Sequence, residues 1–476
     1  MTLKVHNTLT RRLEPFEPLE AGTAKVYACG PTIYDYAHIG NYRSFLCYDL
    51  VHRYLEWSGY EVRFVTNLTD VDDRTIARAG REGVTVAEVT RPFGEAFLAD
   101  ARSLGVLPAD AYPRATEYVG PMIALVERLM ASGHAYQADD GAVYFSIASF
   151  PGYGKLKGID PSSLRVGARV AQDEYEKEDA RDFALWKVAD EADERAAAAW
   201  DSPWGRGRPG WHLECSAMSL GELGETLDLH LGGEDLVFPH HENEIAQSEA
   251  STGKPFVRYW LHVKHLLVEG RKMSKSLGNF ITVRELLEKG YDAASIRHQL
   301  ISAPYRRELN FTLEGLDASR KAVQRLLDFE ARLEGVAVGE SARATRLPEL
   351  AREAVRGFRE AMDDDFNSAD ALAALFTFVN RVNGELDGLA GVPPADRNAA
   401  LEALRSMDRV LGLLEVAHAS RSVDDDLAKW VEGRLRARAD ARQARSFAAA
   451  DAIRNELAAR GIVLEDGPQG TRWKLV

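Results

Sequence analysis

Four residues that lie far apart in the sequence offer the atoms of a metal site: Cys29, Cys215, His240 and Glu244. The two cysteines are among only three in the whole chain. His240 and Glu244 are four residues apart, so on a helix both side chains would lie on one face, as a shared ion requires. Two thiolates, an imidazole and a carboxylate fit the tetrahedral coordination of one zinc ion, which binds thiolate strongly.

The spacing of these residues does not by itself require a metal. Cys29 and Cys215 come from distant segments, unlike a CxxC pair, and a buried cysteine is often only a small hydrophobic residue. Cys47, within an amphipathic segment, is interpreted in that way. The segment HHENE (240–244), however, holds two imidazoles and two carboxylates, more polar groups than an ordinary core contains. This density favours the metal site.

A first phosphate-binding pattern is AHIGN (37–41), which falls in a turn that opens a predicted helix. The N–H groups and the dipole at a helix N-terminus favour an anion there. His38 and Asn41 could add an imidazole and an amide that donate hydrogen bonds to phosphate oxygens. A turn with a capping asparagine is the alternative.

A second phosphate-binding pattern is KMSKS (272–276), a small polar segment between Gly270 and Gly278. Lys272 and Lys275 on a moving loop could close over a leaving pyrophosphate. A solvated surface loop is the alternative. Because both patterns occur in order, one in each half of a split sheet, we interpret them together as an ATP site.

The elements that must position these residues are typical of a doubly wound, Rossmann-like α/β fold. AKVYACG (24–30) and EVRFVTNLT (61–69) predict buried parallel strands, with apolar residues at helical spacing between them. The alternation resumes with a strand at 226–233, a helix at about 239–251 and a strand-like segment at 256–270. Ligands of such sheets lie beyond the carboxyl ends of the strands.

Five regions follow from this organisation, and the bundle among them is predicted to contain a loop at 334–347. The last region should hold two short helices and a hairpin around Gly467-Pro468. The predicted domains are 1–95 (first half of the catalytic domain), 96–205 (a connective insertion of helices and polar loops), 206–312 (its second half), 313–419 (a helical bundle) and 420–476 (a small α/β domain).

Composition limits the class of protein. The hydrophobic (45%) and charged (28%) fractions are those of a globular protein, and no run of about 18 apolar residues predicts a membrane span. The N-terminus lacks the apolar core of a signal peptide. Three cysteines cannot form a disulfide framework, so we expect a reducing cytoplasm.

The net charge of −14 argues against broad nonspecific binding of nucleic acid. It leaves room for a local basic face at residues 433–445, for which an exposed helix face is the alternative. The arginines of this segment are Arg434, Arg436, Arg438, Arg442 and Arg445.

Nearly end to end, the chain resembles the cysteinyl-tRNA synthetases, which carry HIGH and KMSKS motifs. PHHENE and KMSKSLGN together are the most specific part of the resemblance. It rests on VHNTLT (5–10), CGPTIYDYAHIGN (29–41), NLTDVDD (67–73), PRATEY (113–118), GRPGWHLECSAM (207–218), DLHLGGEDLVFPHHENEIAQSE (228–249), KMSKSLGN (272–279), MDDDFN (362–367) and GIVLEDGPQGTRW (461–473).

The resemblance implies that the enzyme activates L-cysteine with ATP to cysteinyl-adenylate and transfers it to the 3′ end of tRNA-Cys. It also implies that the four metal ligands hold Zn²⁺, that this ion binds the substrate thiolate, and that Mg²⁺ accompanies ATP. Serine differs from cysteine by one atom, which a size-based pocket separates poorly, whereas a zinc–sulfur bond requires a thiolate.

Further residue roles follow from the resemblance. His38, Lys272 and Lys275 would stabilise phosphate charge. Asn41 stands where the family motif has histidine, and an amide can donate a hydrogen bond but cannot become a cation. The position's part in charge stabilisation is therefore open.

The motif segments also place Thr69, Trp211 and Asp235 in the cysteine pocket, although Thr69 and Trp211 could be packing or turn residues. The bundle resembles a domain that binds the anticodon stem, and the last segment resembles an anticodon-reading domain. By motif position Arg442, Asp451 and Asp466 would contact base edges, with surface salt bridges as the alternative.

Three rival functions remain open at this point. A cysteine:amino-sugar ligase of the mycothiol pathway shares the activating core but lacks the terminal anticodon-reading segment. A cytidylyltransferase-like enzyme has no need of a cysteine-selective zinc, and a noncatalytic zinc and RNA-binding protein has no need of KMSKS. We expect a monomer that binds ATP, L-cysteine and tRNA-Cys, with no membrane partner.

Overall fold

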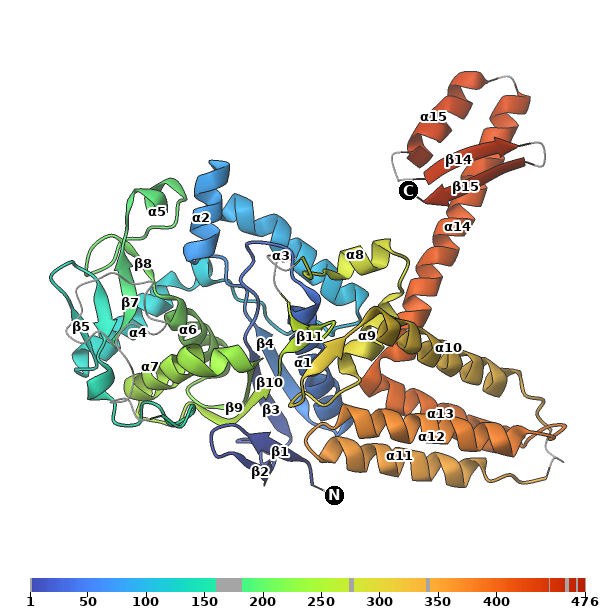
Figure 1. Ribbon diagram of the computed structural model, residues 1–476, viewed down its shortest axis with the longest axis horizontal. Helices are drawn as coiled ribbons and strands as arrows, with labels where there is room; N and C mark the ends of the chain where they lie inside the picture. The colour runs from blue at the N-terminus through green and yellow to red at the C-terminus, as the bar shows by residue number, and fades with distance from the viewer. Residues whose placement is uncertain are drawn as a thin grey trace. The chain divides into compact units, whose positions relative to one another are not determined.

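The computed structural model describes residues 2–159, 182–273, 278–339, 343–444, 446–458, 462–467 and 470–475 of the chain (Figure 1). It contains two compact units, Met1–Leu414 and Glu415–Val476. Lys275 and Arg445 lie outside the described residues, as does the side chain of Asp466.

A four-stranded parallel sheet forms the centre of the first unit, in the order β10-β9-β3-β4. Its first two strands in the sequence are joined by helix α1 (Ile39–Trp57), and its other two come from the far side of a long insertion. The prediction of a Rossmann-like parallel sheet split by an insertion is therefore confirmed. The strands are β3 (Thr23–Ala28), β4 (Glu61–Thr66), β9 (Leu227–Gly233) and β10 (Val257–Val263).

An N-terminal hairpin, β1 (Lys4–Asn7) and β2 (Arg12–Pro15), lies against the β10 edge of this sheet. The amide of Asn7 donates to the carbonyl of Arg258, and its oxygen accepts from the backbone N–H of Trp260. The hairpin thus covers backbone groups that an edge strand would otherwise expose.

The insertion contains an antiparallel sheet that sequence patterning missed, with the order β5-β6-β7-β8. Three of its strands have only three residues, too few to show a two-residue alternation. The strands are β5 (Ala135–Gln137), β6 (Val143–Phe145), β7 (Phe183–Val188) and β8 (Gly207–Pro209). The helices before and after them are α2 (Asp73–Glu82), α3 (Val86–Ser103), α4 (Val119–Ala131), α5 (Glu191–Arg195) and α6 (Trp211–Leu223).

The segment predicted as one strand at 256–270 contributes to two different sheets. After β10 the chain turns and enters a small sheet of order β12-β11-β13, which carries Lys272 at its end. The elements of this part are β11 (Leu266–Val268), β12 (Arg271–Lys272), α8 (Val283–Glu288), α9 (Ala293–Ile301) and β13 (Leu309–Phe311).

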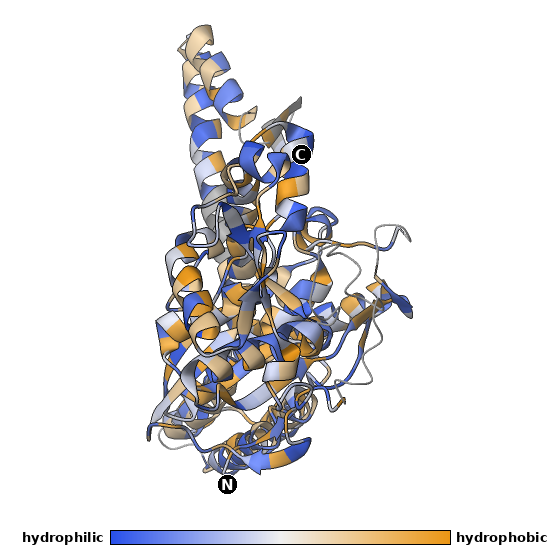
Figure 2. Cartoon of the chain, turned by 90° about the vertical axis from the view of Figure 1, so that its left-hand side faces the viewer, coloured by the Kyte–Doolittle hydropathy of each residue, from blue (hydrophilic) through white to orange (hydrophobic). Residues whose placement is uncertain are grey.

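The predicted helical bundle is present after β13, and its helices lie alongside one another (Figure 1). Figure 2 colours the chain by hydropathy, and helices throughout it carry both hydrophobic and hydrophilic residues, as expected where one face of a helix packs on a neighbour. The helices are α10 (Leu313–Gly335), α11 (Leu347–Asp363), α12 (Ser368–Leu386) and α13 (Pro394–Leu411).

The second unit has the predicted hairpin, in which β14 (Ile462–Gly467) pairs with β15 (Gly470–Leu475) in antiparallel register. Two helices precede it, α14 (Leu413–Gln443) and α15 (Phe447–Ala458). The first of them has 31 residues and is not the short helix that we expected. Val431, Leu457 and Ile462 form the buried core of this unit.

The predicted domain boundaries at 95/96 and 419/420 fall inside α3 and α14, and the five-domain division stays a prediction. Over the described ranges, none of the helices combines the length and the apolar character needed to cross a bilayer.

A buried ionic network connects α1 to the bundle. The carboxylate of Asp49 accepts from Arg53 Nε at 2.9 Å and from Arg297 Nη2 at 2.5 Å, and all three side chains are buried. Arg53 also donates to the carbonyl of Arg409, and Arg297 to that of Leu411, at the end of α13. One carboxylate thus orients two guanidinium groups that tie α1 to the bundle.

We predict that Asp49→Asn lowers the free energy of unfolding at pH 7 by about 3–5 kcal/mol, because it leaves two buried cations without their counter-charge. Burial raises the pKa of Asp49, but the two arginines lower it further, so its net pKa lies below the ordinary value. A depressed carboxyl pKa contributes stability above the unfolded pKa of about 4, and this contribution is lost as the pH falls.

Urea unfolding at several pH values tests this prediction. The difference between the variant and the wild type should shrink below about pH 4. Asp317→Asn, at an exposed position of α10, is the matched control and should change stability by less than about 0.5 kcal/mol. An Asp49→Asn difference as small as the control's, or one that grows in acid, would contradict the prediction.

Candidate metal and nucleotide site

The four predicted metal ligands converge beyond the carboxyl end of β3. Cys29 follows β3, Cys215 lies in α6, His240 lies in the turn Val237–His241, and Glu244 lies in α7 (Glu242–Thr252). All four are buried, and their ligand atoms lie within 4.8 Å of one another.

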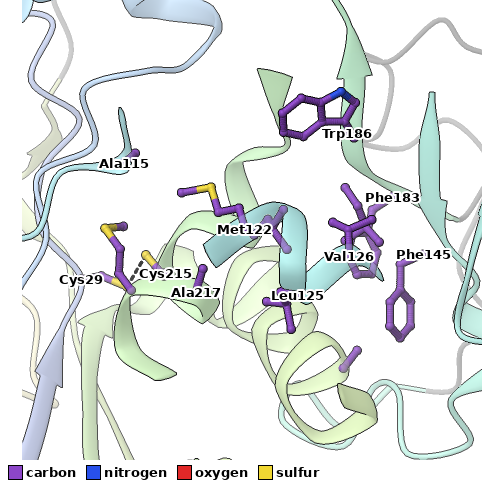
Figure 3. Close-up of a cluster of buried hydrophobic side chains, with 14 of the residues drawn as sticks. Cys29, Ala115, Met122, Leu125, Val126, Phe145, Phe183, Trp186, Cys215 and Ala217 are labelled. Carbon is purple, nitrogen blue, oxygen red and sulfur yellow. Dashed lines mark hydrogen bonds between the residues drawn. The ribbon is translucent and has the colours of Figure 1, made fainter. Parts of the chain in front are cut away.

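The separations within this cluster suit a shared cation. Cys29 Sγ lies 3.8 Å from Cys215 Sγ and 3.9 Å from Glu244 Oε1, and His240 Nε2 lies 3.1 Å from the same oxygen. The two sulfur atoms point toward each other at the border of a hydrophobic core that α4 and α6 help to form (Figure 3). The structure therefore brings together the set that the sequence predicted.

Shared protons balance the negative charges of this buried cluster, as a bound cation would. A hydrogen bond from Cys29 lowers the pKa of Cys215 to about 6 against the effect of burial, and burial raises the pKa of Cys29 well above its ordinary value. Burial lowers the pKa of His240, but Glu244 and Cys215 raise it to about 10. Burial raises the pKa of Glu244, but His230 and His240 lower it to about 2. This donor set fits a divalent ion that takes the place of protons.

A second overlapping set could also surround an ion: Cys29, His230, His241 and Glu244. Cys29, Cys215 and His240 line a cavity of about 410 Å³, whereas His230 and His241 are absent from the described residues that line it. An ion held by the first set can therefore meet a ligand in the cavity, and this favours the set that contains Cys215.

Histidines that we did not predict lie behind three of the four ligands. His241 Nε2 is 3.3 Å from Cys29 Sγ, and His230 Nε2 is 2.9 Å from Glu244 Oε2. His212 Nδ1 is 3.0 Å from the Nδ1 atom of His240. Such outer hydrogen bonds fix the orientation and the basicity of metal ligands.

The three residues predicted for the substrate pocket line the same cavity. Trp211 begins α6, is 40% exposed, and its ring stacks on that of His240 at 4.4 Å between centroids. Thr69 is buried, and its hydroxyl accepts from the amide of Asn67. Asp235 is exposed in the turn Glu234–Leu236. Asn67 also lines the cavity; it begins the NLTDVDD motif, but we did not predict it as a site residue.

His38 and Asn41 line the cavity and also cap α1. His38 Nδ1 accepts from the backbone N–H of Asn41 at 3.1 Å, and Asn41 Oδ1 accepts from the backbone N–H of His38 at 3.0 Å. The capping alternative is thus realised without removing either side chain from the cavity. Because Nδ1 is an acceptor, a neutral His38 carries its proton on Nε2, where it can donate to a ligand.

The structure describes only one of the two lysines of KMSKS, Lys272. Lys272 ends β12 with an exposed side chain and does not line the cavity among the described residues. Lys275 lies outside the described residues. Met273, which follows Lys272, lies close to the start of α1: a Cβ added at Gly40 would be 2.9 Å from Met273 Cε. Ile39 N–H also donates to the carbonyl of Ile281.

The residues predicted to contact RNA lie in the second unit. Arg442 on α14 and Asp451 on α15 have exposed side chains. Within the basic segment, Arg434 pairs with Glu456, and Arg438 is buried. Arg438 thus belongs to the interior of the unit and Arg434 is held by a carboxylate, so the predicted basic face is smaller than the sequence suggested.

Comparison with known proteins finds family matches for three parts of the chain. The family described as tRNA synthetases class I (C) catalytic domain matches residues 15–321. The DALR domain matches residues 357–415, and the cysteinyl-tRNA ligase anticodon binding domain matches residues 424–473.

Full-length relatives agree with these matches. The chain is 48% identical to a cysteine–tRNA ligase of Symbiobacterium thermophilum and 47% identical to one of Solibacter usitatus, with 100% of both chains covered in each case. Among solved structures, a Mycobacterium tuberculosis methionyl-tRNA synthetase in complex with methionyl-adenylate shares the fold, with a TM-score of 0.61 and 16% identity over 83% of this chain and 93% of that one. The chain therefore belongs to the cysteinyl-tRNA synthetase family.

Proposed function

We propose that this chain activates L-cysteine with ATP and transfers it to the 3′ end of tRNA-Cys, with Zn²⁺ selecting the substrate thiolate. One observation carries the proposal: the ligand set of Cys29, Cys215 and His240 lines the same cavity as the phosphate-binding pair His38 and Asn41. An amino acid held through its sulfur would then place its carboxylate in the cavity that also receives ATP.

The metal proposal rests on donor chemistry. Cys29, Cys215, His240 and Glu244 would hold Zn²⁺, which favours two thiolates with nitrogen and oxygen ligands. When bound, the ion lowers the pKa of a thiol and accepts its sulfur, which the hydroxyl of serine matches poorly. Thr69, Trp211 and Asp235 would enclose the rest of the amino acid.

In the first step the carboxylate of cysteine attacks the α-phosphate of ATP, and pyrophosphate leaves. His38 Nε2–H and the amide of Asn41 donate hydrogen bonds to phosphate oxygens at the N-terminus of α1, whose dipole favours the same charge. Lys272 and Lys275 neutralise the leaving pyrophosphate, and Mg²⁺ accompanies ATP. Positioning and electrostatics carry the step without a covalent enzyme intermediate.

In the second step a terminal ribose hydroxyl of tRNA-Cys attacks the carbonyl of cysteinyl-adenylate, and AMP leaves. Arg442, Asp451 and Asp466 would contact anticodon bases. The match of residues 424–473 to an anticodon binding domain favours tRNA over the amino sugar of the mycothiol pathway as acceptor. We further propose that the chain acts as a monomer in the cytoplasm.

Cysteine-dependent exchange of pyrophosphate into ATP tests the proposed function. We predict that chelation of the metal lowers this exchange at least about 100-fold and that Zn²⁺ restores it, since the ion supplies the bond to the substrate. Serine should support exchange with a kcat/KM at least about 10⁴-fold lower than cysteine, because the ion discriminates on sulfur.

Two cysteine variants sharpen this test. Cys215→Ala should lose bound zinc and activity together. Cys47→Ala removes the third buried cysteine, which lies in α1 outside the cluster, and should retain both. Metal-free enzyme that still activates cysteine and still rejects serine would contradict the proposal.

The role of Asn41 is tested by Asn41→Ala. We predict that the kcat/KM of pyrophosphate exchange falls about 10- to 100-fold, because the variant loses an amide that donates to the developing phosphate charge. Loss of the cap should also cost about 1 kcal/mol of stability. Glu88→Ala is the matched control, since Glu88 holds the same N3 position in the capping box of α3 as Asn41 does in α1 but does not line the cavity.

The control separates capping from catalysis. Glu88→Ala should lose similar stability and keep its exchange rate. If Asn41→Ala also keeps its exchange rate, Asn41 acts only as a cap.

The RNA interface is tested by Arg442→Gln. We predict that the Kd for tRNA-Cys rises about 10-fold or more, because a charged contact to a base edge is lost, while cysteine activation stays unchanged. Arg436→Gln on the same helix is the control, because Arg436 is exposed and lies near Glu432. Rising salt should weaken tRNA binding far more than activation. Equal salt sensitivity of the two steps would contradict the assignment.

A further inference from the structure

A line of hydrogen bonds connects the N-terminal hairpin to the sulfur of Cys29. Thr8 Oγ1 lies 2.8 Å from His262 Nδ1, and His262 Nε2 lies 2.8 Å from His241 Nδ1. His241 Nε2 in turn lies 3.3 Å from Cys29 Sγ. Both imidazole rings are buried. Thr8 belongs to the VHNTLT segment, and no step of the proposed reaction uses it.

The surrounding backbone holds both ends of this line in place. Thr8 N–H donates to the carbonyl of Trp260 at 2.8 Å, which fixes the threonine beside the strand that carries His262. At the other end, a Cβ added at Gly232 would lie only 2.2 Å from His241 Cε1. A glycine in β9 thus makes room for the ring, and the hairpin positions the hydroxyl.

The bonds can run in only one direction when Cys29 ligates a metal ion, because a ligating cysteine is a thiolate. A thiolate cannot donate, so His241 must donate from Nε2. A neutral imidazole has one donor and one acceptor nitrogen, so His241 Nδ1 accepts from His262 Nε2–H. His262 Nδ1 must then accept, and the hydroxyl of Thr8 is the donor that faces it.

Removal of the Thr8 hydroxyl would act on Cys29 through the two rings. Without that donor, His262 Nδ1 becomes a buried acceptor with no partner, which is costly. The proton of each ring can then move to Nδ1, which would place the lone pair of His241 Nε2 against the sulfur. Thr8 therefore sets the tautomer of both histidines.

We propose that Thr8, His262 and His241 are positioning residues that fix a hydrogen bond to the sulfur of Cys29 when it ligates the ion and that draw negative charge away from this sulfur. An ion bound by such a sulfur retains more positive charge and attracts a further thiolate more strongly. The inference rests on the proposed function, in which that further thiolate is the substrate.

The experiment compares three variants loaded with Co²⁺ or Zn²⁺. Thr8→Val keeps the shape but loses the donor, Thr8→Ser keeps the donor, and Thr10→Val alters an exposed neighbour in the same hairpin turn. The zinc Kd is measured by competition with a chelator. Cysteine binding is followed across pH by the sulfur-to-cobalt charge-transfer absorption.

We expect Thr8→Val to raise the zinc Kd about 10-fold and to move cysteine binding to higher pH. Thr8→Ser and Thr10→Val should match the wild type. A Thr8→Val protein with wild-type values would overturn the inference, and so would equal losses in Thr8→Val and Thr8→Ser. If the charge-transfer absorption of the cobalt-loaded wild type does not change when cysteine is added, the proposed function is overturned as well.

A measurement on the wild type avoids any dependence on the folding of the variants. Nitrogen NMR of the zinc-loaded protein with labelled histidine reports which ring nitrogen carries the proton. His241 and His262 should both be protonated at Nε2. Protonation of either ring at Nδ1 would overturn the inference.

Discussion

The cost of gathering two thiols, an imidazole and a carboxylate in a buried place governs the architecture around this site. Such groups are stable together only when their charges balance and their remaining lone pairs and protons find partners. The end of β3 supplies one sulfur, α6 the other, and the start of α7 brings nitrogen and oxygen donors. His212, His230 and His241 then supply a further layer of hydrogen bonds. A buried cluster of soft ligands whose remaining polar atoms have partners is suited to hold an ion that recognises sulfur.

At the nucleotide end of the cavity, the same side chains both cap a helix and line the cavity. The side chain of His38 accepts from the backbone N–H of Asn41, and the side chain of Asn41 accepts from that of His38. This reciprocal cap places the proton of a neutral His38 on Nε2, which is then a donor. The same helix carries Asp49, whose two arginines reach the last carbonyls of α13. One helix therefore joins phosphate binding at its N-terminus to the bundle farther along its length.

Local patterns were sufficient for the central fold, whereas the four metal ligands were predicted from their residue types together with the family resemblance. The βαβ unit around α1 has strong apolar periodicity, and cysteine is so rare here that two of three residues were informative. The insertion sheet was missed because most of its strands are short. The length of α14 was missed because we placed a domain boundary at 419/420, inside this helix. His240 and His241 precede Glu244 by four and three residues, and either spacing would face it on a regular helix. The irregular turn Val237–His241 decides which one lines the cavity, and no local pattern encodes that turn.

We propose that the substrate sulfur becomes a ligand of the ion held by Cys29, Cys215, His240 and Glu244. Zinc K-edge X-ray absorption of the zinc-loaded protein, with and without L-cysteine, counts the sulfur neighbours of the ion. We expect this count to rise from two to three with cysteine and to stay at two with serine. A count that remains at two while cysteine is bound would contradict it.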